Sequence, residues 1–275
     1  MICVICGSNT SKIIANKVRD SLKHKIIQCI KCSHVQLFPV PSREEDKKFY
    51  DNNQQEKNLN PSISLQEHRK KKIIDTKKRF ELISKIYKKN DRILEIGSGH
   101  GFLLEKMNES GFDVIGLEVS KERRKISKKV TKCKILNINL MDKNIDIGKF
   151  DLIVFFQVLE HISDSETFLK NLKNILKKKG TLIIEVPNYN DFQIELNTTY
   201  KKWHFQNAHI HYFTPKILKK ILQKSGFNNI KIMGMQRYGI GNMFNWKINK
   251  KPQLHSPDFE FEEGYQWIEK IINNI

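Results

Sequence analysis

The chain of 275 residues is long enough to bury one α/β core and to carry a small extra module. Its formal net charge of +19 suggests an anionic partner, but only eight of the 49 basic residues are arginine, the residue that nucleic-acid sites concentrate. The lysines are spread over stretches expected to be solvated helix faces, such as 70–72 and 177–179, so nucleic acid is a disfavoured partner that the charge does not exclude. No run approaches the roughly 18 consecutive apolar residues of a membrane span, and no signal-peptide pattern opens the chain. We therefore expect a cytoplasmic protein without a membrane span; the sequence does not specify its oligomeric state.

Four of the five cysteines form two C-x-x-C pairs, Cys3 with Cys6 and Cys29 with Cys32. Two such turns can point four thiolates at one tetrahedral zinc ion, and each pair is followed by a small residue that suits the turn. Disulfides are the alternative, which a reducing compartment disfavours. A segment of about 40 residues rarely folds without a stabilising metal or disulfide, so we predict a structural zinc ribbon over residues 1–40. Cys133 lies in an apolar run and is expected to be a core thiol.

Further organisation follows from composition. A polar linker is expected over 41–64, where Phe49 and Tyr50 could pack back onto the ribbon, and a long helix over Leu65 to Lys88. The main domain is predicted to cover 65–240, followed by a C-terminal lid or helix segment over 241–275, with a helix from Phe259. The role of the ribbon is left open between substrate selection, docking and stability.

The main domain contains a glycine turn between an apolar strand and a helix. The sequence Leu94-Glu95-Ile96-Gly97-Ser98-Gly99-His100-Gly101 is followed by residues with helical spacing. Glycines allow a positive φ and a close approach of backbone to a ligand, and the helix start offers free N–H groups. An ordinary strand-to-helix loop is the alternative. The next strand ends at Glu118, and a carboxylate there suits a ribose diol because it accepts two hydroxyl hydrogen bonds.

Apolar runs and helical stretches alternate along this domain. Strands are expected at 91–96, 113–118, 133–137, 150–156 and 180–186, with helices at 102–110, 121–129 and 165–177. Near-continuous apolar runs are typical of parallel strands covered on both faces. The fold class is therefore α/β, a doubly wound and mostly parallel Rossmann-like sheet with ligands at the carboxyl ends of the strands, next to the small ribbon.

The main domain carries its motifs in the order E-x-G-x-G-x-G, then Gly116-Leu117-Glu118-Val119-Ser120, then Phe150 to Val154, which leads into Gln157-Val158-Leu159-Glu160-His161. In these motifs and their order, the chain resembles class I S-adenosylmethionine-dependent methyltransferases over about residues 78–235. The resemblance implies S-adenosylmethionine as cofactor, with Glu95 and Gln157 at its methionine end and Glu118 at its ribose. Asn139, or less favourably Asn137, stands where the family often places an acid for the adenine. The cofactor-binding candidates are Glu95, Gly97, Ser98, Gly99, Gly101, Glu118, Val119, Asn139 and Gln157. Glu160 and His161 either touch substrate or brace their loop.

A loop from Trp203 to Pro215 interleaves three histidines with aromatic residues before a helix at Ile217 to Lys224. It resembles methyltransferases that modify sugars and small metabolites, many of which carry a four-cysteine zinc module. Carbon-methylating relatives have a Tyr-x-Glu-His group, whereas this chain has Gln206 and Ala208 there, so oxygen methylation is expected. A histidine near its ordinary pKa can act as general base for a hydroxyl. The catalytic candidates are His209, His211 and His161, and the substrate candidates are Trp203, Tyr212, Arg237 and Tyr238.

Packing or capping remains the alternative for His204 and His211, and zinc binding by His209 and His211 is a minor one. A strand is expected near Asn229–Met235, and the seventh, antiparallel strand usual in the family is not evident.

The leading interpretation is an O-methyltransferase acting on a small-molecule acceptor, a sugar or sugar-linked metabolite of surface-polysaccharide tailoring. RNA methylation with ribbon-mediated recognition is the second interpretation, but the ribbon holds only Arg19 as arginine. A non-catalytic zinc-ribbon interaction protein is the third, against which the intact glycine turn and its two acids argue.

Overall fold

The computed structural model describes residues 1–42, 44–45, 64–142, 145–235 and 240–251. Contacts divide the chain into two compact units. The first joins residues 1–39 with 188–223 and the described residues from 227 onward, and the second joins 40–187 with 224–226.

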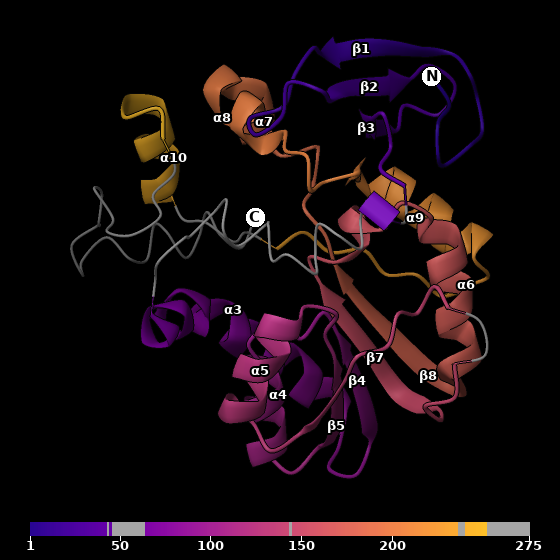
Figure 1. The fold of residues 1–275 in the computed structure, drawn as a ribbon, viewed down its shortest axis with the longest axis vertical. Coiled ribbons are helices and arrows are strands. Elements are labelled where there is room, and N and C mark those ends of the chain that lie inside the picture. The colour runs from indigo at the N-terminus through magenta and orange to yellow at the C-terminus, as the bar shows by residue number, and fades with distance from the viewer. Residues whose placement is uncertain (43, 46–63, 143–144, 236–239, 252–275) are drawn as a thin grey trace. The chain divides into compact units, whose positions relative to one another are not determined.

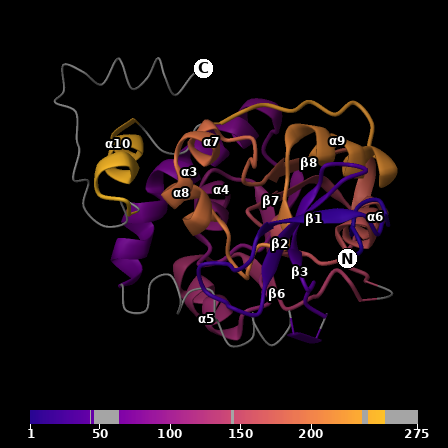
Figure 2. The same cartoon turned by 90° about the horizontal axis from the view of Figure 1, so that it is seen from above.

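The second unit is built on a five-stranded, all-parallel sheet in the order β6-β5-β4-β7-β8. Figures 1 and 2 show α4 and α5 on a different side of these strands from α6. This order places the first strand in the middle and is the doubly wound arrangement expected from the alternating pattern. Its elements are α3 (Leu65–Ile86), β4 (Arg92–Ile96), α4 (Phe102–Glu109), β5 (Asp113–Leu117), α5 (Lys121–Val130), β6 (Lys134–Leu136), β7 (Phe150–Phe156), the 3-10 turn η1 (Leu159–His161), α6 (Ser165–Ile175) and β8 (Leu176–Glu185).

The core of this unit lies on both faces of the sheet, as the apolar strands require. Leu152 and Val154 of β7 pack in one cluster with Ile83 of α3 and Leu104 of α4. Phe155 instead meets Phe168 of α6, edge to face at 5.6 Å between ring centroids. Since successive side chains of a strand point to opposite faces, one apolar run supplies both layers.

The long helix α3 begins where its capping residues predict a start. The Ser64 side chain accepts the N–H of Glu67, and the Glu67 carboxylate accepts the N–H of Ser64, which forms a capping box. The expected range of Leu65 to Lys88 is confirmed to within two residues, because the helix ends at Ile86. Among the described residues, no helix is long and apolar enough to cross a membrane.

The first unit contains a four-stranded antiparallel sheet in the order β1-β2-β3-β9. Strands β1 (Ser11–Ala15), β2 (Lys25–Cys29) and β3 (Val35–Phe38) come from the N-terminal segment, and β9 (His211–Tyr212) comes from far along the chain. The remaining helices are α7 (Phe192–Leu196), α8 (Thr198–His204), α9 (Pro215–Lys224) and α10 (Ile240–Ile248). Residues 188–223 thus share a unit with the N-terminal strands, a pairing that the predicted domain boundaries did not include.

Three local expectations are corrected, and a fourth group lies outside the described residues. Lys177 to Lys179 lie in the exposed start of β8 and not on a helix, because α6 ends at Ile175. The segment 203–214 is not one loop, since it holds the end of α8 and the whole of β9. No strand forms at 229–235, where residues 231–235 are exposed and pair with no strand of the described chain. Phe49, Tyr50 and the helix expected from Phe259 lie outside the described residues.

Candidate functional site

The glycine turn joins the ends of β4 and β5. The N–H groups of Gly97 and Ser98 both donate to the carbonyl oxygen of Leu117, at 2.8 and 3.0 Å. Gly97, Gly99 and Gly101 have φ of +69°, +56° and +82°, a region that side chains with a Cβ disfavour. A Cβ on Gly97 would lie 2.6 Å from Cγ2 of Val158, whereas one on Gly99 would meet no atom within 4 Å. The turn therefore needs glycine for its backbone, and at Gly99 it leaves space beside the chain.

Glu118 is fixed by the backbone on two sides. One carboxylate oxygen accepts the N–H of Gly99 at 2.9 Å and the other accepts the N–H of Ser120 at 2.8 Å. The side chain is buried, whereas Val119 next to it is exposed. These contacts tie the acid at the end of β5 to the glycine turn, and the lone pairs that remain can accept the hydroxyls of a ribose.

Glu95 is a buried carboxyl group at the end of β4. Burial raises its pKa to about 8; the positive charge of Arg79 opposes this shift and the negative charge of Glu118 adds to it. Its Oε2 atom is buried and has no hydrogen-bond partner among the described residues. A buried acceptor of this kind suits the ammonium group at the methionine end of S-adenosylmethionine, so the residues present fit the cofactor that the sequence pattern implies.

Arg124 of α5 connects the ends of β5 and β6, a contact that the sequence pattern did not reveal. Its Nη1 atom donates to the carbonyl oxygen of Glu118 at 2.7 Å and to Oδ1 of Asn137 at 2.9 Å. Asn139 is exposed, and its Oδ1 accepts the N–H of Met141 at 3.0 Å in a local turn. The expected adenine contact of Asn139 stays a prediction, and it would use the second lone pair of an oxygen already engaged.

Gln157 follows β7 in a left-handed conformation with φ of +59°. Its N–H donates to the carbonyl oxygen of Glu185 at 2.8 Å, and its Nε2 donates to the Glu185 carboxylate at 3.0 Å. A side chain with a Cβ is uncommon at this φ, and the two contacts with β8 hold it there. Glu185 was not among the predicted site residues, because nothing near it in sequence marks it.

The L-E-H motif forms η1, a single 3-10 turn after Gln157. Glu160 is fully buried and His161 nearly so, and Nε2 of His161 lies 3.8 Å from a Glu160 carboxylate oxygen. The N–H of His161 donates to the carbonyl oxygen of Val158 at 3.0 Å. The motif therefore places an imidazole beside a carboxylate, a few residues after Gln157.

In the first unit, His211 is a buried residue in contact with two other rings. It is only 1 % exposed, its Nδ1 lies 3.1 Å from Nε2 of His34, and its ring stacks on Phe213. Burial lowers the pKa of His34 well below its ordinary value, with the neighbouring His211 adding to the shift. His204 is likewise buried, and burial and then the charge of Arg19 lower its pKa to about 4. These placements favour the packing alternative for His204 and His211.

His209 belongs to a hydrogen-bonded chain that starts in the N-terminal segment. Arg19 donates to the Gln206 side-chain oxygen, and Nε2 of Gln206 lies 2.8 Å from Nε2 of His209. Arg19 also donates to the carbonyl oxygen of Trp203 at 3.1 Å and lies over its ring. The Tyr212 hydroxyl accepts the N–H of Gln206 and donates to its carbonyl oxygen. Trp203 and Tyr212 thus have defined structural contacts, and their substrate roles stay predictions. Arg237 and Tyr238 lie outside the described residues.

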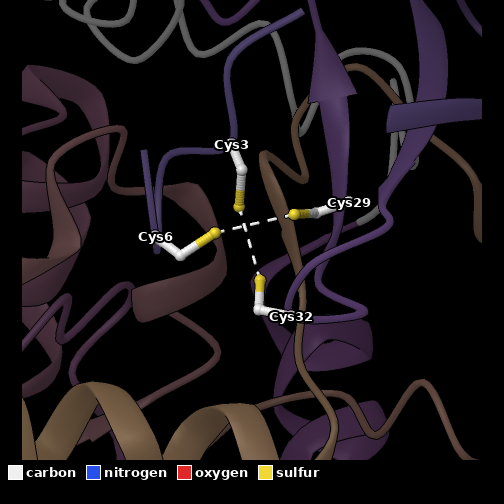
Figure 3. A group of neighbouring side chains, drawn as sticks. All are labelled: Cys3, Cys6, Cys29 and Cys32. Carbon is white, nitrogen blue, oxygen red and sulfur yellow. Dashed lines mark hydrogen bonds between the residues drawn. The ribbon is translucent and has the colours of Figure 1, made fainter. Parts of the chain in front are cut away.

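The four paired cysteines converge on one point. Their sulfur atoms all lie within 4.8 Å of one another, and Figure 3 shows them turned inward. The Sγ atoms of Cys3 and Cys32, and those of Cys6 and Cys29, are 3.6 Å apart, too far for a disulfide. Tetrahedral zinc with Zn–S bonds of about 2.3 Å would separate its sulfurs by about 3.8 Å. The geometry therefore fits a four-thiolate zinc site.

Two left-handed residues shape the turns that carry these cysteines. Gly7 has φ of +71° and donates its N–H to the carbonyl oxygen of Cys3, and Ser33 has φ of +64° and donates to that of Cys29. Each turn thereby brings both of its thiols toward the same point. Burial acts to raise the pKa of Cys29, but hydrogen bonds from the Cys32 backbone and from thiols lower it to about 7.

Comparison with known proteins identifies the fold and the family together. A methyltransferase domain family matches residues 65–232, more than half of the chain. The chain belongs to this family. This methyltransferase also shares its fold with an S-adenosylmethionine-dependent methyltransferase from Archaeoglobus fulgidus, at a TM-score of 0.53 and 18 % identity over 81 % of this chain and 89 % of that one. Magnesium protoporphyrin IX methyltransferase from Synechocystis, solved with bound S-adenosylhomocysteine, gives a TM-score of 0.54 at 14 % identity over 72 % of this chain and 94 % of that one.

Three curated relatives are ubiquinone biosynthesis O-methyltransferases. The methyltransferase is 35 % identical to that of Pelagibacter ubique over 104 residues, 36 % of this chain and 43 % of the relative. It is 25 % identical to the Coxiella burnetii protein over 169 residues, 57 % of this chain and 72 % of the relative. The human mitochondrial protein is 26 % identical over 58 % of this chain and 47 % of its own length. The match thus spans less than half of two of these relatives, and none of the three is named as a sugar methyltransferase. The expected similarity to sugar methyltransferases is therefore not supported.

Proposed function

We propose that this protein transfers a methyl group from S-adenosylmethionine to a hydroxyl oxygen of a small molecule. The observation that carries the proposal is the junction of β4 and β5, where Glu118 accepts backbone N–H groups from both sides and Glu95 keeps a buried acceptor. The family match and the O-methyltransferase relatives support it. When bound, the cofactor would supply a methyl group on a sulfonium, open to in-line attack by the acceptor oxygen.

Four groups of residues would hold the cofactor. Glu95 and Gln157 would meet its methionine end, and Glu118 would accept its ribose hydroxyls. The backbone of Gly97, Ser98, Gly99 and Gly101 would line its approach, with Val119 beside it. Asn139 is proposed for the adenine, two residues after Asn137, which Arg124 links to the Glu118 carbonyl oxygen. Each of these groups accepts hydrogen bonds or leaves space, as a cationic and hydroxyl-rich ligand requires.

A general base must take the proton of the acceptor hydroxyl. We propose His161 for this role, because it lies in the same unit as the proposed cofactor residues and beside the buried Glu160 carboxylate at 3.8 Å. A carboxylate next to an imidazole stabilises the imidazolium that forms on proton transfer. His209 is the second candidate and would contact the acceptor. For His211 we propose a structural role, because its Nδ1 atom contacts His34.

The acceptor class is proposed from two sources. The named relatives suggest a hydroxyl of a precursor in quinone biosynthesis, and the residue pattern of the 203–215 segment suggests a sugar hydroxyl. RNA is the less favoured acceptor, because the guanidinium of Arg19, the arginine of the N-terminal segment, already donates hydrogen bonds to Trp203 and Gln206. We further propose that Cys3, Cys6, Cys29 and Cys32 hold a structural zinc ion that stabilises the first unit.

The test combines binding and turnover. Titration calorimetry should show S-adenosylhomocysteine binding to the wild type, and a methyl-transfer screen over catechols, nucleotide sugars and RNA should find its acceptor among the small molecules. His161→Gln should bind S-adenosylhomocysteine as the wild type does and lose most of its turnover. Failure of the wild type to bind would contradict the proposed cofactor, methylation of RNA alone would contradict the acceptor class, and full turnover by His161→Gln would contradict the base.

A further inference from the structure

Arg79 of α3 makes an ion pair that ends beside the proposed cofactor residues. Its Nε and Nη2 atoms donate to the two carboxylate oxygens of Glu185, at 3.0 and 2.6 Å. Its guanidinium lies over the ring of Phe156 at 4.5 Å. The side chains of Arg79 and Glu185 are only 14 % and 17 % exposed. Two-point contact, ring stacking and burial together fix the position of this carboxylate more firmly than a surface ion pair would.

Glu185 in turn holds Gln157 in place through two hydrogen bonds. Its carboxylate accepts the Nε2 hydrogen of Gln157 at 3.0 Å, and its backbone carbonyl accepts the Gln157 N–H at 2.8 Å. An ionised carboxylate only accepts hydrogen bonds, so the NH₂ group of Gln157 must face it. The amide oxygen of Gln157 is then the atom available to accept a hydrogen bond from a ligand. Glu185 thereby determines which atom of Gln157 a cofactor can use, and Arg79 holds Glu185 in place.

Arg79 also acts on Glu95 through its charge. The groups that act electrostatically on Glu95 are Arg79 from α3 and Glu118, which follows β5. The charge of Glu95 acts in turn on the Cys133 thiol, next to β6. Arg79 is the cation of this set, and it opposes the burial that favours the neutral acid. A neutral carboxyl group would hold an ammonium ion far less well than a carboxylate.

We propose that Arg79 is a positioning residue for the methyl donor: its two-point contact with Glu185 orients Gln157 toward the cofactor. This inference rests on the proposed S-adenosylmethionine site. The competing explanation is that Arg79 only fastens α3 to the end of β8. That role would change stability but would not change how cofactor binding depends on pH.

The test is calorimetric binding of S-adenosylhomocysteine between pH 6.5 and 9.5. Arg79→Met should weaken binding about tenfold at pH 7.5, the loss expected for a charged hydrogen-bonding group, and should move the rise of affinity with pH to higher values. Arg79→Lys keeps the charge without the two-point contact, so it should bind more weakly with an unmoved pH profile. The amino group of the ligand titrates equally in every variant, so the difference between variants reports on Glu95.

Arg69→Met is the matched control. Arg69 lies on the same helix, makes two contacts with a glutamate, Glu105, and covers a phenylalanine ring, Phe102. The Arg69→Met variant should bind S-adenosylhomocysteine with the wild-type affinity and the wild-type pH profile. If Arg79→Met binds S-adenosylhomocysteine with the affinity and the pH profile of the wild type, the proposal is overturned. If the Met variant does not fold, wild-type affinity in Arg79→Lys would overturn it. Failure of the wild type itself to bind would instead refute the proposed cofactor site.

Discussion

The side-chain nitrogen of Gln206 lies 2.8 Å from Nε2 of His209, and Arg19 decides what that contact means. Arginine has donors only, so the amide oxygen of Gln206 must face Arg19 and its NH₂ group must face His209. Nε2 of His209 is therefore the acceptor, and neutral His209 carries its proton on Nδ1. In this state His209 would offer an acceptor molecule a hydrogen-bond donor, which argues against His209 as the general base.

This tautomer can be observed directly. Long-range ¹H–¹⁵N spectra should show Nδ1 of His209 protonated and Nε2 unprotonated in the wild type. Gln206→Glu replaces the donor by a second acceptor, so it should move the proton to Nε2 or charge the ring. Gln223→Glu, at an exposed position of α9, should leave the His209 signals in place. An Nε2–H tautomer in the wild type would contradict the assignment.

Metal analysis tests the cysteine cluster. The purified chain should contain about one zinc ion, because four thiolates at these separations fill a tetrahedral site. Cys29→Ser should lose the zinc and lower the melting temperature, since metal binding and folding are coupled in small ribbons. Cys133→Ser is the control, because that thiol contacts Thr131 and the Leu104 carbonyl in the other unit. Equal zinc content in wild type and Cys29→Ser would refute the site.

Local patterns predicted the glycine turn and its strands correctly, and the reason is physical. Glycine at Gly97 and Gly101 reflects backbone angles fixed within the turn itself, and the apolar run of β7 reflects burial on both faces. The same holds for the left-handed residues after each cysteine pair. In these places the information needed to choose a structure lies within about ten residues.

Contacts between distant residues could not be predicted in this way. Arg79 and Glu185 are 106 positions apart, and His34 and His211 are 177 apart. The strand β9 has only two residues and exists because β3 offers a free edge to pair with. No periodicity or spacing in either segment signals its partner, so the ion pair and the added strand emerge only from the tertiary structure.

Gly97→Ala should weaken S-adenosylhomocysteine binding at least about tenfold. The φ of +69° strains alanine, and its Cβ would come within 2.6 Å of Val158, so the turn must shift. Gly111→Ala is the matched control: it has a similar φ of +85° but meets only the flexible Lys89 side chain, at 3.4 Å. It should lose about 1 to 2 kcal/mol of stability from the left-handed backbone and keep its affinity. Equal affinities for both variants would show that the turn does not approach the cofactor.

The buried carboxyl group of Glu95 should make stability depend on pH with a definite sign. Its pKa is raised to about 8 in the folded protein by burial, from an ordinary value of 4.5. The folded state therefore binds this proton more tightly, so its contribution to stability is complete below about pH 4.5 and is lost as the pH rises through about 8. Glu95→Gln has no such group, and its stability relative to wild type should grow by a few kcal/mol between pH 5 and 9, at about 1.4 kcal/mol for each pKa unit.

Urea unfolding of both proteins at several pH values measures this difference. The same variant should bind S-adenosylhomocysteine more weakly at pH 9, because a neutral amide replaces the carboxylate proposed to face the ammonium group. Glu81→Gln, at an exposed position of α3, should track the wild type in both measurements. A stability difference between Glu95→Gln and wild type that stays constant from pH 5 to 9 would show that Glu95 does not titrate in this range. If Glu95→Gln is more stable than the wild type but binds S-adenosylhomocysteine more weakly, Glu95 contributes to cofactor binding and lowers the stability of the fold.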